Sequence, residues 1–195
     1  RTGNAIATMW KTTGIPVEMR DALADYMVKK FTKMNFEFRK NVLVLWSRQS
    51  GKRGGAHIEL DSSYTGIRQL AREFAIKKAT ATVLLAGDES KSGGKLAQLA
   101  TESKHIIDVS NMWKDEAWTK EPLKSSPYLG QFTFFKEVMG ESNIVHIGMR
   151  SGVLESMALL GMKTLYMEPD VCPSGSRMLA FGRGGIHYTR VNIKA

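Results

Sequence analysis

The segment NIVHIGMRSGVLESMALLGMKTLYM, residues 143–167, carries the clearest signal for the fold. Its apolar run 143–148 predicts a buried strand, the segment 153–160 predicts a helix, and 164–167 predicts a second strand. A strand, a helix and a strand in this order form a right-handed crossover between parallel strands. This stretch therefore predicts an α/β protein with a parallel sheet.

The same alternation continues on the N-terminal side of this stretch. Apolar runs predict strands and amphipathic segments predict helices, while 112–128 is expected to be a long loop over one end of the sheet and the tail to end in a short edge strand near 187–193. The further strands are expected at 42–46, 82–86 and 105–109, and the further helices at 17–38, 62–78, 94–103 and 132–139. The chain is thus predicted to be a Rossmann-like, three-layer parallel sheet of about five strands at 40–195, after an N-terminal helical segment at 1–39.

The composition indicates which kinds of partner to expect. The 195 residues are 43% hydrophobic and 24% charged, which is typical of a globular domain, and the formal net charge is +9. This charge favours an anionic partner such as nucleic acid, a phosphate group or a membrane surface. The single cysteine, Cys172, excludes a disulfide scaffold, and no zinc-binding motif is present, so we expect no metal.

The ends of the chain and its hydropathy bear on where it acts. No apolar run is long enough to span a membrane. The chain starts at Arg1 rather than Met, so we expect a processed chain or a domain of a longer protein, such as an effector or toxin domain. We expect it to act in the cytoplasm, or to be delivered into a host cytosol.

In a parallel sheet of this kind, ligands bind outside the carboxyl ends of the strands. After the first strand the loop 47–55 carries Arg48, Lys52 and Arg53 among three glycines, a composition suited to a phosphate. A solvated basic loop is the plain alternative. After the second strand, Asp88 and Glu89 are candidate catalytic acids or bases, and an ordinary helix-capping loop is the alternative.

The most informative loop follows the 143–148 strand. Ser151 and Gly152 begin the next helix, whose free amides and positive dipole end favour an anion. Arg150 lies beside them, where we expect it to be exposed and to bind phosphate, and Glu155 follows one turn later. The alternative is that Ser151 is only an N-cap and Glu155 only offsets the dipole. Arg177 is a further candidate, aimed back at the site.

The segment 143–170 resembles the nucleotide-sugar-binding half of GT-B glycosyltransferases, in its glycine-containing turn, its helix with Glu155, and its turn with Gly161 and Thr164. The run VLVLWSRQSGKR, 42–53, resembles the strand and basic loop of fucosyltransferase-type members. The resemblance implies that Glu155 binds the donor ribose, and that Arg48, Arg150 and the amides of 151–152 bind the diphosphate. A complete GT-B enzyme has two such halves, and this chain has room for one.

The favoured hypothesis is therefore a metal-independent glycosyltransferase that uses a nucleotide sugar as donor and a protein or glycan as acceptor. Asp61, Asp88 or Glu89 could supply the base, and the sequence does not choose among them. One alternative is an NAD or nucleotide glycohydrolase. Another is a nucleic-acid-binding module, supported by the net charge and by the tail residues Arg183, His187, Tyr188, Arg190 and Lys194.

Overall fold

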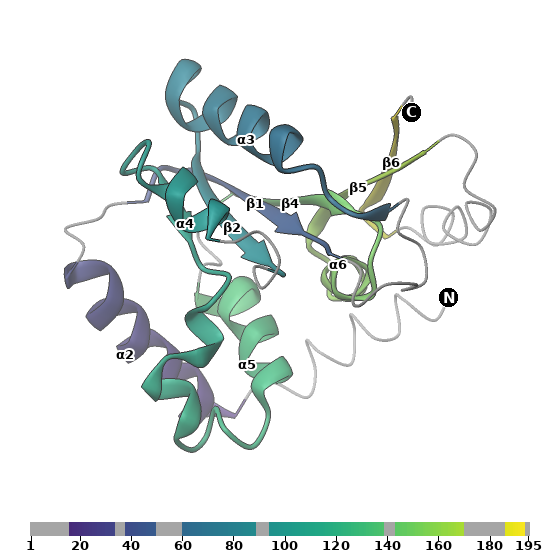
Figure 1. The fold of residues 1–195 in the computed structure, drawn as a ribbon. Coiled ribbons are helices and arrows are strands. Elements are labelled where there is room, and N and C mark those ends of the chain that lie inside the picture. Colours follow the sequence, from purple (N-terminus) through teal and green to yellow (C-terminus); the bar gives the residue numbers. More distant parts are fainter. Residues whose placement is uncertain are drawn as a thin grey trace.

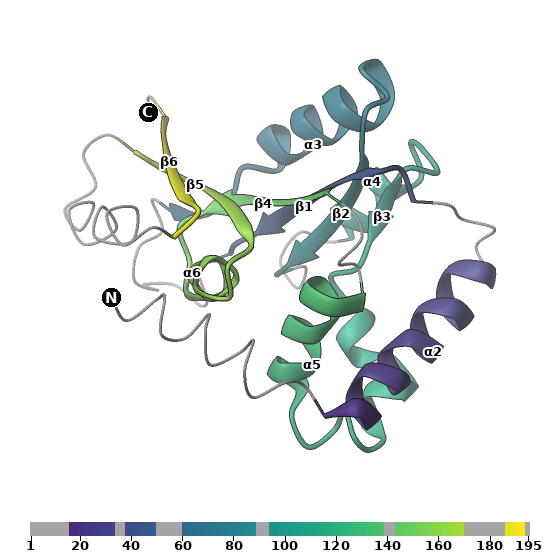
Figure 2. The same cartoon turned by 180° about the vertical axis from the view of Figure 1, so that it is seen from behind.

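A six-stranded, all-parallel sheet organises the protein (Figures 1 and 2). The computed structural model describes residues 16–33, 38–49, 60–88, 94–138, 143–169 and 186–193. The strands are β1 (Asn41–Ser47), β2 (Thr82–Gly87), β3 (Ile106–Asp108), β4 (Asn143–Met149), β5 (Lys163–Pro169) and β6 (Tyr188–Ile193). Their order is β3-β2-β1-β4-β5-β6, and every adjacent pair is parallel. This order is that of Rossmann-type folds, which confirms the predicted α/β class.

The sixth strand is the predicted edge strand of the tail. It pairs with β5 from Thr164 opposite Tyr188 to Pro169 opposite Ile193. The sequence predicts about five strands and a short edge strand in the tail, and the sheet has six strands in all.

Strand β1 shows why the sequence forms a sheet covered on both faces. Its burial pattern leaves only Asn41 exposed. Val44 and Trp46 belong to one hydrophobic cluster, while Leu43 and Leu45 belong to a second one. Because side chains alternate along a strand, a run that is apolar at every position must be buried on both faces.

The helices form two layers, one on each face. On the first face lie α3 (Tyr64–Arg72), its π-helical continuation η2 (Glu73–Lys77) and α4 (Lys95–Ala100). On the opposite face lie α2 (Val17–Lys33), α5 (Pro127–Thr133) with its continuation η5 (Phe134–Val138), and α6 (Gly152–Leu159). Figure 1 shows α3 above the sheet and α2, α5 and α6 below it.

The N-terminal helix α2 shares the core of the sheet. Its Met19, Leu23 and Tyr26 are buried in the same cluster as Trp46 of β1. The hydroxyl of Tyr26 also donates to the carboxylate of Asp115 at 2.6 Å. The helical segment is therefore part of the packed unit, and the boundary at residue 39 stays a prediction.

The segment expected to be a loop, 112–128, contains two 3₁₀ turns, η3 (Met112–Lys114) and η4 (Glu116–Thr119). Trp118 is buried, and its ring packs edge-on against the rings of Trp113 and Tyr26. Trp118 thus anchors this segment against α2, and Trp113 anchors it against Phe134 and Phe135 of η5.

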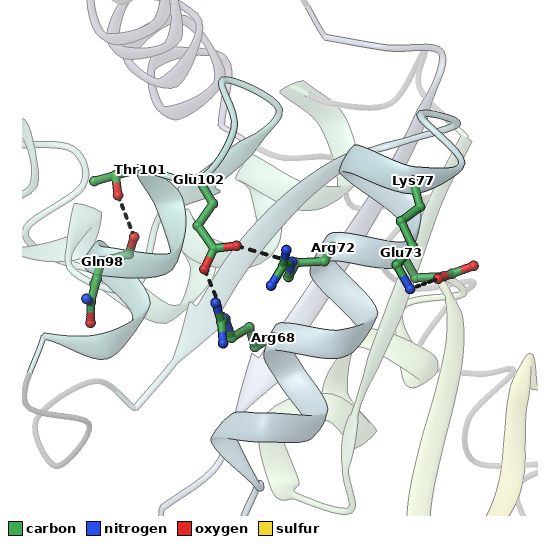
Figure 3. A network of polar contacts seen from close by, with 7 residues as sticks. All are labelled: Arg68, Arg72, Glu73, Lys77, Gln98, Thr101 and Glu102. Carbon is green, nitrogen blue, oxygen red and sulfur yellow. Dashed lines mark hydrogen bonds and ion pairs between the residues drawn. The ribbon is translucent and has the colours of Figure 1, made fainter.

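Charged side chains on the outer surface connect α3 to α4 (Figure 3). The carboxylate of Glu102, which follows α4, lies 2.9 Å from Arg68 Nε and 3.4 Å from Arg72 Nε. Glu73 pairs with Lys77 one turn further along, at 3.2 Å. Water reaches these partly exposed pairs and screens them, so each contributes little to stability.

Candidate functional site

The strand order reverses between β1 and β4, and this point defines the candidate site. Trp46 of β1 lies opposite Gly148 of β4, so Arg48 and Arg150 follow the ends of two neighbouring strands. The chain leaves β1 towards α3 on one face and leaves β4 towards α6 on the other. A crevice outside the carboxyl ends opens where two such connections diverge.

Two glycines allow the central strands to approach closely at this edge. A Cβ atom on Gly148 would lie 2.8 Å from the Cβ of Trp46. Gly87 ends β2 with a φ of +96°, and a Cβ there would overlap the carbonyl oxygen of Ser47. Only glycine adopts this backbone conformation without strain, so both positions hold the rim of the crevice in shape.

The end of β1 is held by hydrogen bonds to its neighbours. The amide of Arg48 donates to Ser62 Oγ at 2.9 Å, and the amide of Ser62 donates to the carbonyl of Arg48 at 2.8 Å. The amide of Gln49 donates to the Asp88 carboxylate at 3.1 Å, and Ser47 Oγ donates to the Asp88 carbonyl at 3.1 Å. The predicted catalytic residue Asp88 is thus exposed and hydrogen-bonded to Ser47 and Gln49, on either side of Arg48. Its role as a base stays a prediction.

Helix α6 begins where the sequence predicts. Ser151 is its N-cap, and the Ser151 hydroxyl accepts from the amide of Leu154 at 3.3 Å. Gly152 is exposed, and a Cβ built on it would meet no atom within 4 Å. Space is therefore open beside the first residue of α6, next to the positive end of its dipole. Glu155 lies half-buried in the first turn.

The predicted exposure of Arg150 is wrong. Its side chain is only 6% exposed, and its Nη1 lies 3.4 Å from Oε2 of Glu168, a fully buried carboxylate on β5. Oε1 of Glu168 lies 2.5 Å from Nε of Arg190 on β6. The reason is that β4, β5 and β6 are adjacent and in register, which brings the two arginines to the two oxygens of one carboxylate.

Tyr188 and Glu155 belong to the same neighbourhood. Burial, above all, and the negative charge of Glu155 raise the pKa of Tyr188 above its ordinary value, whereas the charge of Arg150 opposes the rise. The ring of Tyr188 stacks on Tyr166 with a centroid distance of 4.2 Å. The tyrosine hydroxyl therefore stays neutral among Glu155, Glu168 and Arg150.

Sequence reasoning did not identify Glu168 and Arg190 as site residues. The sequence places Arg190 among the basic residues of the tail, and the strand that it predicts at 164–167 ends just before Glu168. One signal was present in the sequence, because Glu168 is an ionisable residue at the end of an otherwise apolar strand, a position that needs a buried partner.

A groove of about 840 Å³ lies beside the crevice, on the face that carries α3. Its floor is apolar, and Asp61, Ser62 and Ser63 lie at the end where α3 begins. None of the described helices covers β5 and β6 on this face. The apolar floor and wall comprise Leu45, Ile67, Leu70, Ile147, Met149, Met167 and Ile193.

Behind the crevice, His146 of β4 is completely buried. Its Nδ1 accepts a hydrogen bond from Trp46 Nε1 at 3.0 Å. Indole N–H can only donate, so the imidazole proton resides on Nε2, for which the described residues offer no hydrogen-bond partner. Burial lowers the pKa of His146 from 6.5 to about 3. This histidine is a neutral core residue.

Four predicted site residues, Lys52, Arg53, Glu89 and Arg177, lie outside the described residues. Within the described part, no three His, Cys, Asp or Glu side chains gather where they could hold a metal ion. A search of the same residues finds no helix with the length and apolar character required to cross a bilayer.

Comparisons with protein-family models, with curated proteins and with solved structures found no match. The function is therefore inferred from the topology of the sheet and from the residues at the carboxyl ends of its strands.

Proposed function

We propose that this chain binds a nucleotide sugar at the crevice between β1 and β4 and transfers the sugar to an acceptor without a metal. The observation that supports this proposal is the meeting of two anion-favouring features where the strand order reverses. One is the loop that carries Arg48, and the other is the open N-terminus of α6 at Gly152. Their backbone ends follow neighbouring strands, about 5 Å apart, a spacing suited to the two phosphates of a diphosphate.

The chemistry follows from where charge develops. When the bond between sugar and diphosphate breaks, negative charge builds on the leaving phosphate. Donors held before the reaction stabilise that charge with little reorganisation. In this proposal they are the amides at 152–153, with the Arg48 guanidinium as the neutralising cation. Asp88, exposed at the same edge, is positioned to accept a proton from an acceptor hydroxyl. Glu155, in the first turn of α6, would accept hydrogen bonds from the hydroxyls of the ribose.

The nucleic-acid alternative draws less support from the described tail. Tyr188 is only 4% exposed, and the guanidinium of Arg190 pairs with the buried Glu168. Neither side chain offers the free, exposed cation or ring that a phosphate backbone or an unstacked base requires.

Calorimetry with GDP-, UDP- and CMP-sugars and with NAD tests the proposal. We expect one nucleotide sugar to bind, and Glu155→Gln to weaken that nucleotide by about tenfold, the cost of one charge-assisted contact. The same substitution should lower the affinity for the 2′-deoxyribose analogue of that nucleotide by a smaller factor. Glu116→Gln, an exposed acid on η4 paired with Lys120, is the matched control and should bind as the parent does.

Product analysis separates transfer from hydrolysis of NAD. Release of the nucleoside diphosphate with sugar found on an acceptor supports the proposal, and release of nicotinamide supports the glycohydrolase alternative. Absence of binding by every nucleotide sugar would overturn the proposed function.

A further inference from the structure

The cluster of Arg150, Glu168 and Arg190 has an uneven distribution of charge. Two guanidiniums share one carboxylate, and the contact to Arg190 (2.5 Å) is much closer than the contact to Arg150 (3.4 Å). The side chains of Arg150 and Glu168 are 6% and 0% exposed, and that of Arg190 is 24% exposed. Glu168 therefore attracts Arg190 more strongly than Arg150, and the three side chains together carry one net positive charge.

The position of Arg150 brings this net positive charge close to the start of α6 in the chain. It directly precedes Ser151, the N-cap of α6. Its backbone amide donates to the carbonyl of Met167 at 3.1 Å, which fixes the residue against β5. A buried charge is poorly screened, so it acts through several ångströms of protein on an anion at the helix end. Glu155, in the first turn of the same helix, acts with the opposite sign.

We propose that Glu168 is a built-in counter-anion and that, together with Arg190, it sets the affinity of the α6 N-terminus for a diphosphate. Glu168 lowers the positive charge behind the helix end, and Arg190 offsets part of that effect with its own positive charge. Neither residue has to touch the ligand. This inference rests on the proposed function for the place of the diphosphate, and it adds two residues that determine how tightly the diphosphate is held.

Two variants break the same ion pair and change its charge in opposite directions. Glu168→Gln adds one positive charge to the cluster, and Arg190→Gln removes one. By Coulomb's law, adding or removing a unit charge at a separation of roughly 8 Å, with an effective dielectric constant of about 20–40, changes affinity by roughly five- to thirtyfold. We therefore expect Glu168→Gln to bind inorganic pyrophosphate about tenfold more tightly than the parent, and Arg190→Gln about tenfold more weakly.

The double variant Glu168→Gln/Arg190→Gln keeps the parental net charge and should return pyrophosphate affinity to within about threefold of the parent. The double variant also tests the inference if one of the single variants does not fold. The melting temperature without ligand shows whether each variant is folded. Glu102→Gln and Arg68→Gln make the same charge changes in the exposed network on the other face (Figure 3). Because water screens them, these controls should change affinity less than twofold.

The sign of the two shifts decides the inference. Opposite shifts support it. Shifts of the same sign, or no shift, mean that the ion pair is only structural and overturn it, as does a failure of pyrophosphate to bind any of these proteins. The same titrations with GDP and UDP keep the two proposals separate, because opposite pyrophosphate shifts without nucleotide binding would refute the proposed function alone.

Discussion

Replacing His146 by Asn should remove a large part of the acid sensitivity of this protein. His146 is completely buried in β4, and Trp46 Nε1 donates to its Nδ1 at 3.0 Å. The amide oxygen of Asn branches from the same carbon as Nδ1 of histidine, so the variant retains an acceptor for Trp46 while losing the titratable ring. Phe135 packs edge-on against that ring, with centroids 5.3 Å apart.

The magnitude follows from the pKa in the two states. Burial lowers the pKa of His146 to about 3 in the folded protein, against 6.5 for the free group. Below pH 6.5, His146 therefore binds a proton in the unfolded chain but stays neutral in the folded chain. The stability that this residue contributes is complete above pH 6.5 and is lost progressively as the pH falls towards 3. Between pH 7 and pH 5 the loss is about 2 kcal/mol.

Urea unfolding followed by far-UV circular dichroism at several pH values between 7 and 5 measures this difference. At pH 7 we expect His146→Asn to be less stable than the parent by about 1–3 kcal/mol, because the smaller side chain leaves a cavity. At pH 5 the gap should close by about 2 kcal/mol. Other titrating groups, including His105, are common to both proteins and cancel in the difference. Parallel stability curves for the two proteins would refute the reasoning.

Three further predictions concern stability and are checked by the melting temperature or by urea unfolding. Arg150→Ala should lower the free energy of unfolding by about 1–3 kcal/mol, since it removes a buried side chain and one of the two partners of the Glu168 carboxylate, and an unchanged stability would contradict its burial. Ser151→Ala should cost about 1 kcal/mol through loss of the N-cap of α6, with no effect expected if the cap does not form in solution. Gly87→Ala should cost about 2 kcal/mol or more because of the positive φ and the overlap with β1, whereas Gly152→Ala, in open space, should change stability by less than 1 kcal/mol; equal effects would refute the geometry.

The fold was predictable from the sequence because its strands are buried on both faces. A run such as Val42–Trp46 has no polar position at which an exposed strand could face water, and helices with one apolar side separate it from the next run. Local periodicity therefore carried enough information for the parallel sheet and for the start of α6 at Gly152.

The environment of Arg150 was not predictable in the same way. Its exposure depends on Glu168, 18 positions later, and on Arg190, 40 positions later, and these become its neighbours only when β4, β5 and β6 pair in this register. A loop position at the end of a strand is ordinarily exposed, so local reasoning favoured the wrong outcome. The groove beside α3 has the same origin, because its floor combines side chains of four strands.

The position of β1 at the centre of the sheet also matters while the chain is being synthesised. One edge of β1 pairs with β2, starting at Val42 opposite Thr82, but the other edge waits for β4, with Asn41 opposite Asn143. About 100 residues separate these partners, which at about 5–20 residues per second leaves that edge of β1 open for roughly 5–20 seconds on the ribosome. An uncharged, apolar strand with an open edge is the kind of segment that associates with other nascent chains. Yield in cells should therefore depend on translation speed and chaperone supply between residues 47 and 143.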